Sequence, residues 1–227
     1  MCGRYALSAT LLEIAAAFGA RDSNDGKWGW QPSFNIAPST TVPVMALNGA
    51  AQRVVVPMRW GLHPHWSKDM PQGRPMFNAR IETASEKPSF RTPWKRRRAL
   101  FPVSGWYEWE VIEVEGGKTF KQPHFIFDAE APLTCLAGLW DHYHVDEGIT
   151  LLSATILTTH ATGSIKTLHH RMPVRLPESA WAGWLNPEMK SDRVMEQMDD
   201  GGNLDFHPVS REVSNGRAQG EHLINPI

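Results

Sequence analysis

Two apolar runs flank a short polar turn in the stretch that decides the fold class: Thr41-Val42-Pro43-Val44-Met45-Ala46-Leu47, then Asn48-Gly49, then Arg53-Val54-Val55-Val56. Valine and other β-branched residues are favoured in strands, where they pack well on a pleated surface. An Asn-Gly pair supplies the positive φ angles that a tight hairpin turn needs. The stretch therefore predicts a β-hairpin.

Strand-like runs continue along most of the chain beyond this hairpin. A second hairpin is expected around Gly116-Gly117, between the strand-like runs 111–115 and 119–121. Further runs rich in β-branched and aromatic residues predict strands at 125–127, 133–139, 149–157 and, in a mixed C-terminal segment, from 205 onward.

Helical signals are fewer. Thr10 and Glu13 form a capping-box pattern before the apolar repeat of residues 11–18, and Gly19 is a natural helix end. Pro177 precedes a second helical pattern, and 188–198 is amphipathic. Strands with a few helices, but without regular βαβ alternation, indicate an α+β fold. We expect one compact domain over residues 2–227, with a mainly antiparallel, barrel-like β-sheet core and peripheral helices.

Composition excludes several classes of protein. The 227-residue chain has a net charge of −1, so a polyanion would have to bind at a local basic patch. Because no run of about 18 apolar residues occurs, we expect no membrane partner. The chain has only two cysteines, which suits the reducing cytosol, and we expect a cytoplasmic monomer, associated with the nucleoid in a bacterium.

Metal and cofactor signals are weak. His63-Pro64-His65 and His142-Tyr143-His144 each place two imidazoles two residues apart. Neither a Cys-x-x-Cys nor a His-Glu-x-x-His pattern accompanies them, and no glycine-rich phosphate-binding loop is present. We therefore expect neither a metal nor a cofactor.

Cys2 is the most unusual residue by position. Removal of Met1 would leave it as the N-terminus, with an α-amine and a thiol on adjacent carbons. An α-amine has a reference pKa of about 7.7–8.0, so it is nucleophilic near neutral pH and condenses with an aldehyde to a Schiff base. The thiol can then close on the imine carbon to give a thiazolidine. Position alone equally fits an unremarkable terminal residue, or a nucleophile that attacks an amide.

Residues 80–98 carry seven basic side chains against two acidic ones, a local charge of +5. Phe90 and Trp94 lie inside this window. Cations interleaved with aromatic rings suit single-stranded nucleic acid, because phosphates need positive charge and bases need flat surfaces. A solubilising loop is the alternative interpretation.

Two further stretches could supply proton transfer. Glu108 lies among three large aromatic residues in Gly105-Trp106-Tyr107-Glu108-Trp109. If its side chain points inward, desolvation raises its pKa toward neutrality; if outward, it is an ordinary strand glutamate. His169 and His170 precede Arg171, and histidine is the usual proton shuttle near pH 7. Trp106 fits a core position or a stacking surface equally well.

Seven motifs together resemble one known family, that of the SOS-response-associated peptidases (SRAP), the abasic-site processing proteins. The motifs are Met1-Cys2-Gly3-Arg4, Phe34-Asn35-Ile36-Ala37-Pro38, Trp60-Gly61-Leu62 with Pro64 and Trp66, Phe77-Asn78-Ala79-Arg80 with Glu82-Thr83, Gly105-Trp106-Tyr107-Glu108-Trp109, Leu168-His169 with Arg171-Met172-Pro173, and His207-Pro208-Val209-Ser210. They occur in order along almost the whole chain, so the resemblance is specific.

This resemblance implies a DNA-repair protein that binds single-stranded DNA and traps the aldehyde of an abasic site on its N-terminal cysteine. It implies that Cys2 is the nucleophile, Asn78 and His169 line the active site, and Glu108 is the acid/base. It suggests DNA contacts by Arg4, Asn35, Pro38, Trp66, Arg80, Trp109 and Arg171. An abasic-site lyase side activity and a peptidase activity on the protein itself are further expectations. Ser67 replaces a second tryptophan that some relatives carry, which weakens the stacking expected there.

Two alternatives stay open at this stage. An N-terminal-cysteine amidohydrolase or peptidase would act without DNA, because glutamine amidotransferases also begin Met-Cys-Gly. A noncovalent single-strand binder would bind DNA through salt-sensitive contacts regardless of the lesion or of Cys2.

Overall fold

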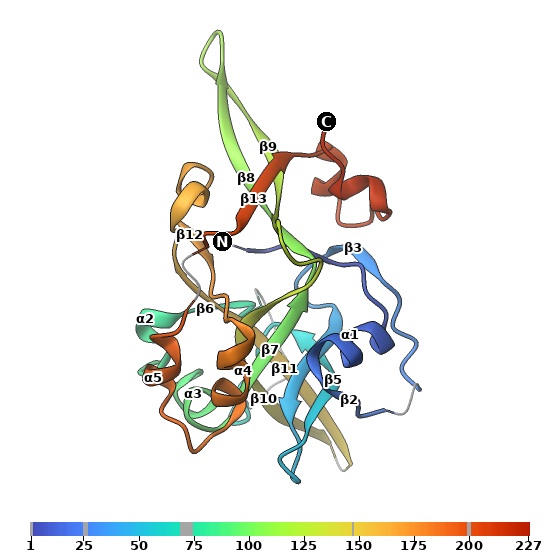
Figure 1. Cartoon of the computed structure of the whole chain (residues 1–227), viewed down its shortest axis with the longest axis vertical. Helices are drawn as coiled ribbons and strands as arrows, with labels where there is room; N and C mark the ends of the chain where they lie inside the picture. Colours follow the sequence, from blue (N-terminus) through green and yellow to red (C-terminus); the bar gives the residue numbers. More distant parts are fainter. Residues whose placement is uncertain (1, 25–26, 69–74, 147, 199–200) are drawn as a thin grey trace.

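Five strands close into a barrel in the computed structural model, which describes residues 2–24, 27–68, 75–146, 148–198 and 201–227; they occupy the lower half of the view in Figure 1. The strands are β4 (Thr41–Leu47), β5 (Arg53–Trp60), β7 (Arg98–Val103), β10 (Thr134–Asp146) and β11 (Ile149–His160). They are hydrogen-bonded in the order β11-β10-β7-β4-β5, and a parallel pairing of β11 with β5 closes the ring. Three short strands attach to it: β12 (Arg171–Pro173) and β6 (Asn78–Arg80) to β11, and β2 (Arg21–Asp22) to β5.

A second sheet continues from the barrel. Its order is β13 (Leu204–Pro208), β9 (Lys118–Asp128), β8 (Gly105–Val114), β1 (Tyr5–Leu7) and β3 (Ser33–Ile36). Because only Ser104 separates β7 from β8, the chain passes directly from the barrel into this sheet. The ends of β8 and β9 project as a long hairpin (Figure 1). Gly116 and Gly117 turn it with φ angles of 87° and 71°, which favour glycine.

Helices cover the outside of the barrel, as predicted. They are α1 (Leu11–Phe18), α2 (Ile81–Ala84), α3 (Arg91–Arg96), α4 (Glu178–Leu185) and α5 (Ser191–Met195). Three 3-10 turns accompany them: η1 (Gly163–Thr167), and η2 (Arg211–Ser214) and η3 (Glu221–Ile224), which pack on the second sheet. The capping box of Thr10 and Glu13 forms, and Gly19 ends α1 in the left-handed region at φ 55°. Within the described part of the chain, no helix is long and apolar enough to cross a bilayer.

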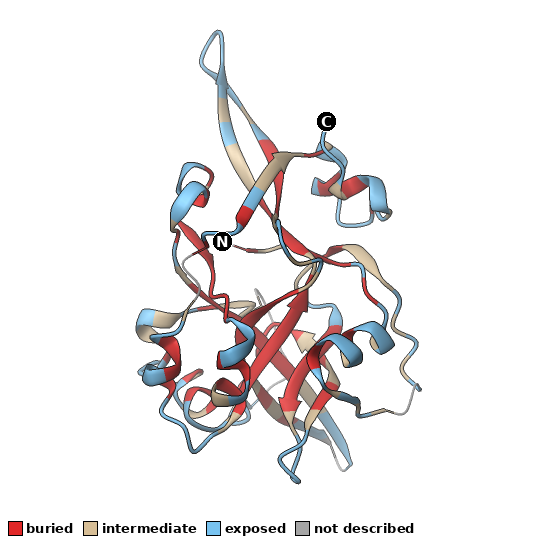
Figure 2. Cartoon of the chain, viewed as in Figure 1, coloured by how far each residue is buried: buried red, intermediate tan, exposed pale blue. Residues whose placement is uncertain are grey.

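Buried side chains concentrate in the barrel and at its junction with the second sheet (Figure 2). A smaller apolar cluster lies on the other face of that sheet, where Tyr107 and Phe125 meet Val209, Val213 and Leu223 of the C-terminal segment. The α+β class, the antiparallel barrel-like core and the peripheral helices are therefore confirmed.

Two local predictions need correction. The β4–β5 connection spans residues 48–52, and its positive φ lies at Ala51 (57°) instead of at Asn48 or Gly49. The Asn48 side chain accepts from the backbone N–H groups of Ala50 and Gln52, so it organises a longer loop in place of the tight turn. The amphipathic pattern of 188–198 forms only the short helix α5.

Residues 80–98, the basic window, do not form the predicted aromatic stacking surface, because their two aromatic rings are buried. Phe90 and Trp94 are buried in the core, and Trp94 packs edge-on against Trp184. Arg98 is buried as well: its guanidinium lies over Trp184 and donates to the carbonyls of Asn186 and Met189. The window therefore joins α2 and α3 to the barrel and offers no ring to a DNA base.

Candidate active site at the chain start

Cys2 is completely buried where the start of the chain enters the second sheet. The N–H of Tyr107 donates to the carbonyl of Arg4 at 2.9 Å, which extends the β1–β8 pairing toward Cys2. Asn78 comes from the barrel side, since it lies on β6, which pairs in parallel with the barrel strand β11. Its Nδ2 donates to the Cys2 carbonyl at 2.7 Å. Two sheets thus hold Cys2 at their junction.

Glu108 points inward. Alternation along β8 places Trp106 and Glu108 on one face and Tyr107 on the other, where Tyr107 joins the smaller apolar cluster. The Glu108 side chain is only 3% exposed, and its burial raises the pKa of the carboxyl to about 7. A carboxyl that titrates near neutral pH can both accept and return a proton at physiological pH.

The thiol of Cys2 lies within the electrostatic reach of this carboxyl. Burial raises the pKa of Cys2 well above its ordinary range, and the negative charge of Glu108 raises it further. Burial, followed by the charge of Cys2, likewise raises the pKa of the Tyr5 hydroxyl. The sulfur is therefore a neutral thiol at pH 7, and any nucleophilic step by it requires removal of its proton.

His169 belongs to the same neighbourhood. Burial lowers its pKa, and the positive charge at the start of the chain lowers it further, as that charge also does for Cys2 and Glu108. Nδ1 of His169 lies 3.0 Å from both the backbone nitrogen and the carbonyl oxygen of Arg171, so the Arg171 backbone fixes the orientation of the ring. His170 stacks on His169 with ring centres 4.3 Å apart and is exposed.

Arg171, expected at DNA phosphates, is only 4% exposed. Its guanidinium forms a two-pronged ion pair with Glu82, at 3.0 and 2.9 Å, and donates to the Thr158 carbonyl at 2.6 Å. Arg80, at the end of β6, is exposed, and its charge acts on His170. The two arginines thus lie beside His169 and His170 but differ in their freedom to meet a ligand.

Arg4 and Asn35 lie on the side of the C-terminal segment. Arg4 donates to Asn35 Oδ1 at 2.6 Å and to the Val213 carbonyl at 3.0 Å. Asn35 is buried, and its Nδ2 donates to the carbonyls of Asn215 and Ala218. In this structure both side chains hold η2 and its following turn against β1 and β3.

The other expected DNA contacts occupy separate positions. Trp66 lies in the segment after β5 and is 56% exposed. Trp109 is half-buried on β8, and its indole N–H donates to Ser214 at 3.0 Å. Pro38 is half-buried in the turn after β3. Trp106 is fully buried, so of its two predicted positions, core or stacking surface, the structure shows the core.

Two buried polar atoms of residues that interact with Cys2 have no hydrogen-bond partner among the described residues: Asn78 Oδ1 and the Tyr5 hydroxyl. Buried polar atoms are normally paired, so such a group of them indicates a place for a polar ligand. Tyr5 was not expected here. Its closeness to Cys2 in the sequence, three residues away, could have suggested it. Only the burial of its hydroxyl, however, shows that it belongs to the site.

A metal centre does not emerge from the residues that the structure describes, where no cluster of three histidine, cysteine or acidic side chains could hold an ion. His65 instead contacts the buried Asp141 at 3.0 Å, and Arg97 contacts the same carboxylate at 2.9 Å. The removal of Met1 concerns a residue outside the described ones and stays a prediction.

The sequence matches known proteins over nearly its whole length. Residues 1–216 match the family described as SOS response associated peptidase (SRAP). "Abasic site processing protein YoaM" of Bacillus subtilis is 33% identical over 228 residues, covering 99% of this chain and 98% of that protein. "Abasic site processing protein YedK" of Escherichia coli is 31% identical and is covered completely, as is this chain. "Abasic site processing protein HMCES" of Pongo abelii is 29% identical, over all of this chain and 76% of that protein.

Solved structures show the same fold. A protein from Bacteroides thetaiotaomicron superimposes with a TM-score of 0.83 at 23% identity, over 100% of both chains. A phage-related protein from Bordetella bronchiseptica gives a TM-score of 0.73 at 26% identity, over 97% of this chain and 100% of that one. On the match of residues 1–216, the chain belongs to the SOS response associated peptidase family.

Proposed function

We propose that this protein processes abasic sites in DNA and that Cys2 bonds covalently to the ring-opened aldehyde of such a site in a single strand. One observation carries the proposal: Cys2 is buried against Asn78 and within reach of a carboxyl, Glu108, whose pKa is about 7. Three relatives, each named an abasic site processing protein, support the choice of substrate.

The first step is attack by the Cys2 α-amine, once Met1 has been removed. The amine nitrogen forms a bond to the aldehyde carbon, and Glu108 takes a proton from the nitrogen. Glu108 delivers that proton to the aldehyde oxygen, which gives a carbinolamine. It then carries the second nitrogen proton to the same oxygen as the C–O bond breaks, so that water leaves and the C=N bond forms. The imidazole of His169, which the Arg171 backbone holds in place, is suited to exchange a proton with that oxygen.

The thiol completes the cross-link. Its sulfur adds to the imine carbon while its proton passes to the imine nitrogen, which gives a thiazolidine with no net change in protons. The raised pKa of Cys2 keeps the thiol protonated until a base is close. The imine also acidifies the neighbouring C–H of the sugar, so a β-elimination lyase activity competes with ring closure. A peptidase activity on the chain itself stays a second, untested part of the proposal.

In this proposal, exposed side chains hold the DNA. Arg80 is exposed and suited to a phosphate, and Trp66 offers an exposed ring for base stacking. Arg4, Asn35, Pro38, Trp109 and Arg171 stay candidate contacts. For Arg171 a phosphate would have to share or replace Glu82, to which its guanidinium is bound.

The test is a cross-linking assay with an oligonucleotide that carries one abasic site, in single-stranded and duplex form. The wild type is expected to give a complex that survives denaturing electrophoresis, with more product on the single strand. Cys2→Ala is expected to give none without borohydride, yet a reduced Schiff base with it, because its α-amine remains. Cys135→Ala is the matched control, since it removes the other buried cysteine.

Three results would contradict the proposal. Intact mass that shows Met1 retained on the active protein would leave Cys2 without a free amine. Equal noncovalent binding of abasic and intact strands by wild type and Cys2→Ala would indicate a simple single-strand binder. Hydrolysis of amides in the absence of DNA would favour the N-terminal-cysteine hydrolase instead.

A further inference from the structure

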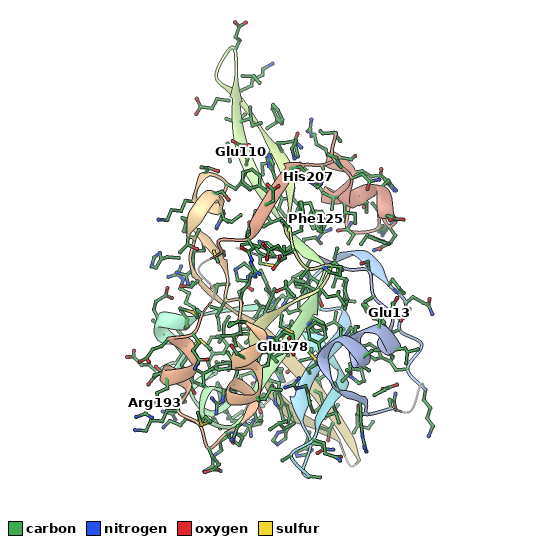
Figure 3. The ribbon with its side chains drawn as sticks, viewed as in Figure 1. Glu13, Glu110, Phe125, Glu178, Arg193 and His207 are labelled. Carbon is green, nitrogen blue, oxygen red and sulfur yellow. The ribbon has the colours of Figure 1, made fainter. Side chains whose placement is uncertain are left out.

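His124 lies directly across the sheet from Glu108. The register of β8 with β9 pairs Glu108 with His124 and Glu110 with Gln122. Side chains of directly paired residues point to the same face, with Cβ atoms about 4.5–5.5 Å apart. His124 therefore shares the face on which Glu108 approaches Cys2, while its sequence neighbour Phe125 lies on the opposite face with His207 (Figure 3).

The imidazole is buried and only half satisfied. His124 is 6% exposed, and its Nε2 lies 3.6 Å from Oε2 of Glu110. Its Nδ1 is buried without a hydrogen-bond partner among the residues described. The ring packs edge-on against Phe206 at 5.7 Å, and Pro208 is its register partner on β13. From β8 the titratable groups facing it are Glu108 and Glu110, and β13 presents none at these two positions.

The two glutamates differ sharply in access to water. Glu108 is 3% exposed, whereas the Glu110 side chain is 41% exposed, where β8 rises into the projecting hairpin (Figure 3). His124 is paired with the first and contacts the second. An imidazole can take a proton on one nitrogen and release one from the other, so His124 is suited to relay a proton between the buried carboxyl and the exposed one.

We propose that His124 is a positioning residue that acts through Glu108, passing protons between that carboxyl and solvent by way of Glu110. This inference rests on the proposed function, because the cross-link reaction creates the need for it. An α-amine that enters the reaction as ammonium must lose one proton overall before its nitrogen bonds to the aldehyde carbon. Glu108 accepts that proton, Nδ1 of His124 takes it from Glu108, and Nε2 releases one to Glu110 and water.

The test compares His124→Phe with wild type in single-turnover cross-linking across pH 5.5–9. Phenylalanine keeps a flat ring against Phe206 but exchanges no proton. We expect a rate at least about tenfold lower, within the range that a proton-transfer group contributes, and an altered pH profile. His124→Ala should lose rate similarly and recover part of it with added imidazole. His207→Phe, the same exchange on the other face of the sheet, is the control and should keep the wild-type pH profile.

A second measurement separates this inference from the proposed function. The carboxyl carbon of Glu108, followed by NMR without DNA, should titrate at a different pH in His124→Phe than in wild type. If wild type forms no cross-link, the proposed function fails, and the NMR titration still decides whether His124 and Glu108 are coupled. If His124→Phe cross-links at the wild-type rate with an unchanged pH profile, and Glu108 titrates as before, the inference is wrong while the proposed function stands.

Discussion

Residues 80–98 and residues 105–109 look alike as sequence, because each mixes charged side chains with large aromatic ones. In the structure they have opposite designs. In the first segment the rings of Phe90 and Trp94 are buried and most of the cations face solvent. In the second, the carboxyl of Glu108 is buried together with Trp106. The comparison teaches that a large number of charges in a segment does not identify a reactive group. Burial identifies one here, because desolvation shifts the pKa of Glu108.

The largest expected effect is on the reaction. Glu108→Gln removes the one acid/base of the 105–109 segment while keeping its shape, and we expect the cross-linking rate to fall about 10²–10⁴-fold. Single-turnover assays on an abasic single strand measure this loss. Glu113→Gln, at an exposed glutamate farther along β8, is the control and should lose far less. A Glu108→Gln rate within a factor of two of wild type would contradict the claim that residues 105–109 supply the acid/base.

The next effect is on stability and concerns the other segment. Trp94→Ala should destabilise the fold by about 3–5 kcal/mol, as truncation of a buried aromatic does, with no specific loss of DNA affinity per folded molecule.

Trp66→Ala should have the opposite effect: the unfolding midpoint stays the same, and single-strand binding weakens by about 1–3 kcal/mol, the value of one stacked base. Urea unfolding and fluorescence anisotropy with labelled DNA measure the two quantities. Weak binding by folded Trp94→Ala would restore the window as a stacking surface.

The buried carboxyl also predicts a pH dependence of stability. The pKa of Glu108 rises from 4.5 to about 7 on folding, so between these values the folded state binds more protons than the unfolded state. Stability therefore falls as pH rises through this window, by about 3 kcal/mol in total at 1.36 kcal/mol per pKa unit. Urea unfolding at pH 5 and pH 8 tests this. Glu108→Gln should lack that part of the slope; an identical slope in both proteins would contradict the assignment.

The smallest effect is expected at an exposed cation of the basic window. Arg96→Ala should change the free energy of unfolding by less than about 0.5 kcal/mol, as typical surface substitutions do. We expect the cross-linking rate to stay unchanged, and any loss of DNA affinity to vanish at high salt. Titrations at two salt concentrations measure this. A large, salt-resistant loss would place Arg96 in the binding site.

Local patterns sufficed where the physics is local. Thr10, Glu13 and Gly19 fix the ends of α1 because caps satisfy backbone groups of neighbouring residues. Gly116 and Gly117 fix the hairpin of β8 and β9 for the same kind of reason. The loop after Leu47 was mispredicted, because the Asn48 side chain competes for backbone N–H groups and moves the positive φ to Ala51.

Partners distant in sequence escaped prediction. The ion pair of Arg171 with Glu82 joins β12 to α2, and the bonds of Asn35 to Asn215 and Ala218 join β3 to the C-terminal segment. Nothing within either local pattern specifies such a partner, because the pairing depends on how the sheets meet. For the same reason His124 carried no signal: its importance comes only from the register that sets it opposite Glu108.

By itself the sequence determined the α+β class, the family motifs and the kind of reaction that Cys2 is able to carry out, since these depend on residue type and short spacing. Only the tertiary structure decided whether Glu108 points inward, which aromatic rings are core, and which polar groups surround Cys2. The physical reason is that the site lies where two sheets meet. Burial and proximity there arise from strands far apart in the chain, and they set the pKa values on which the chemistry depends.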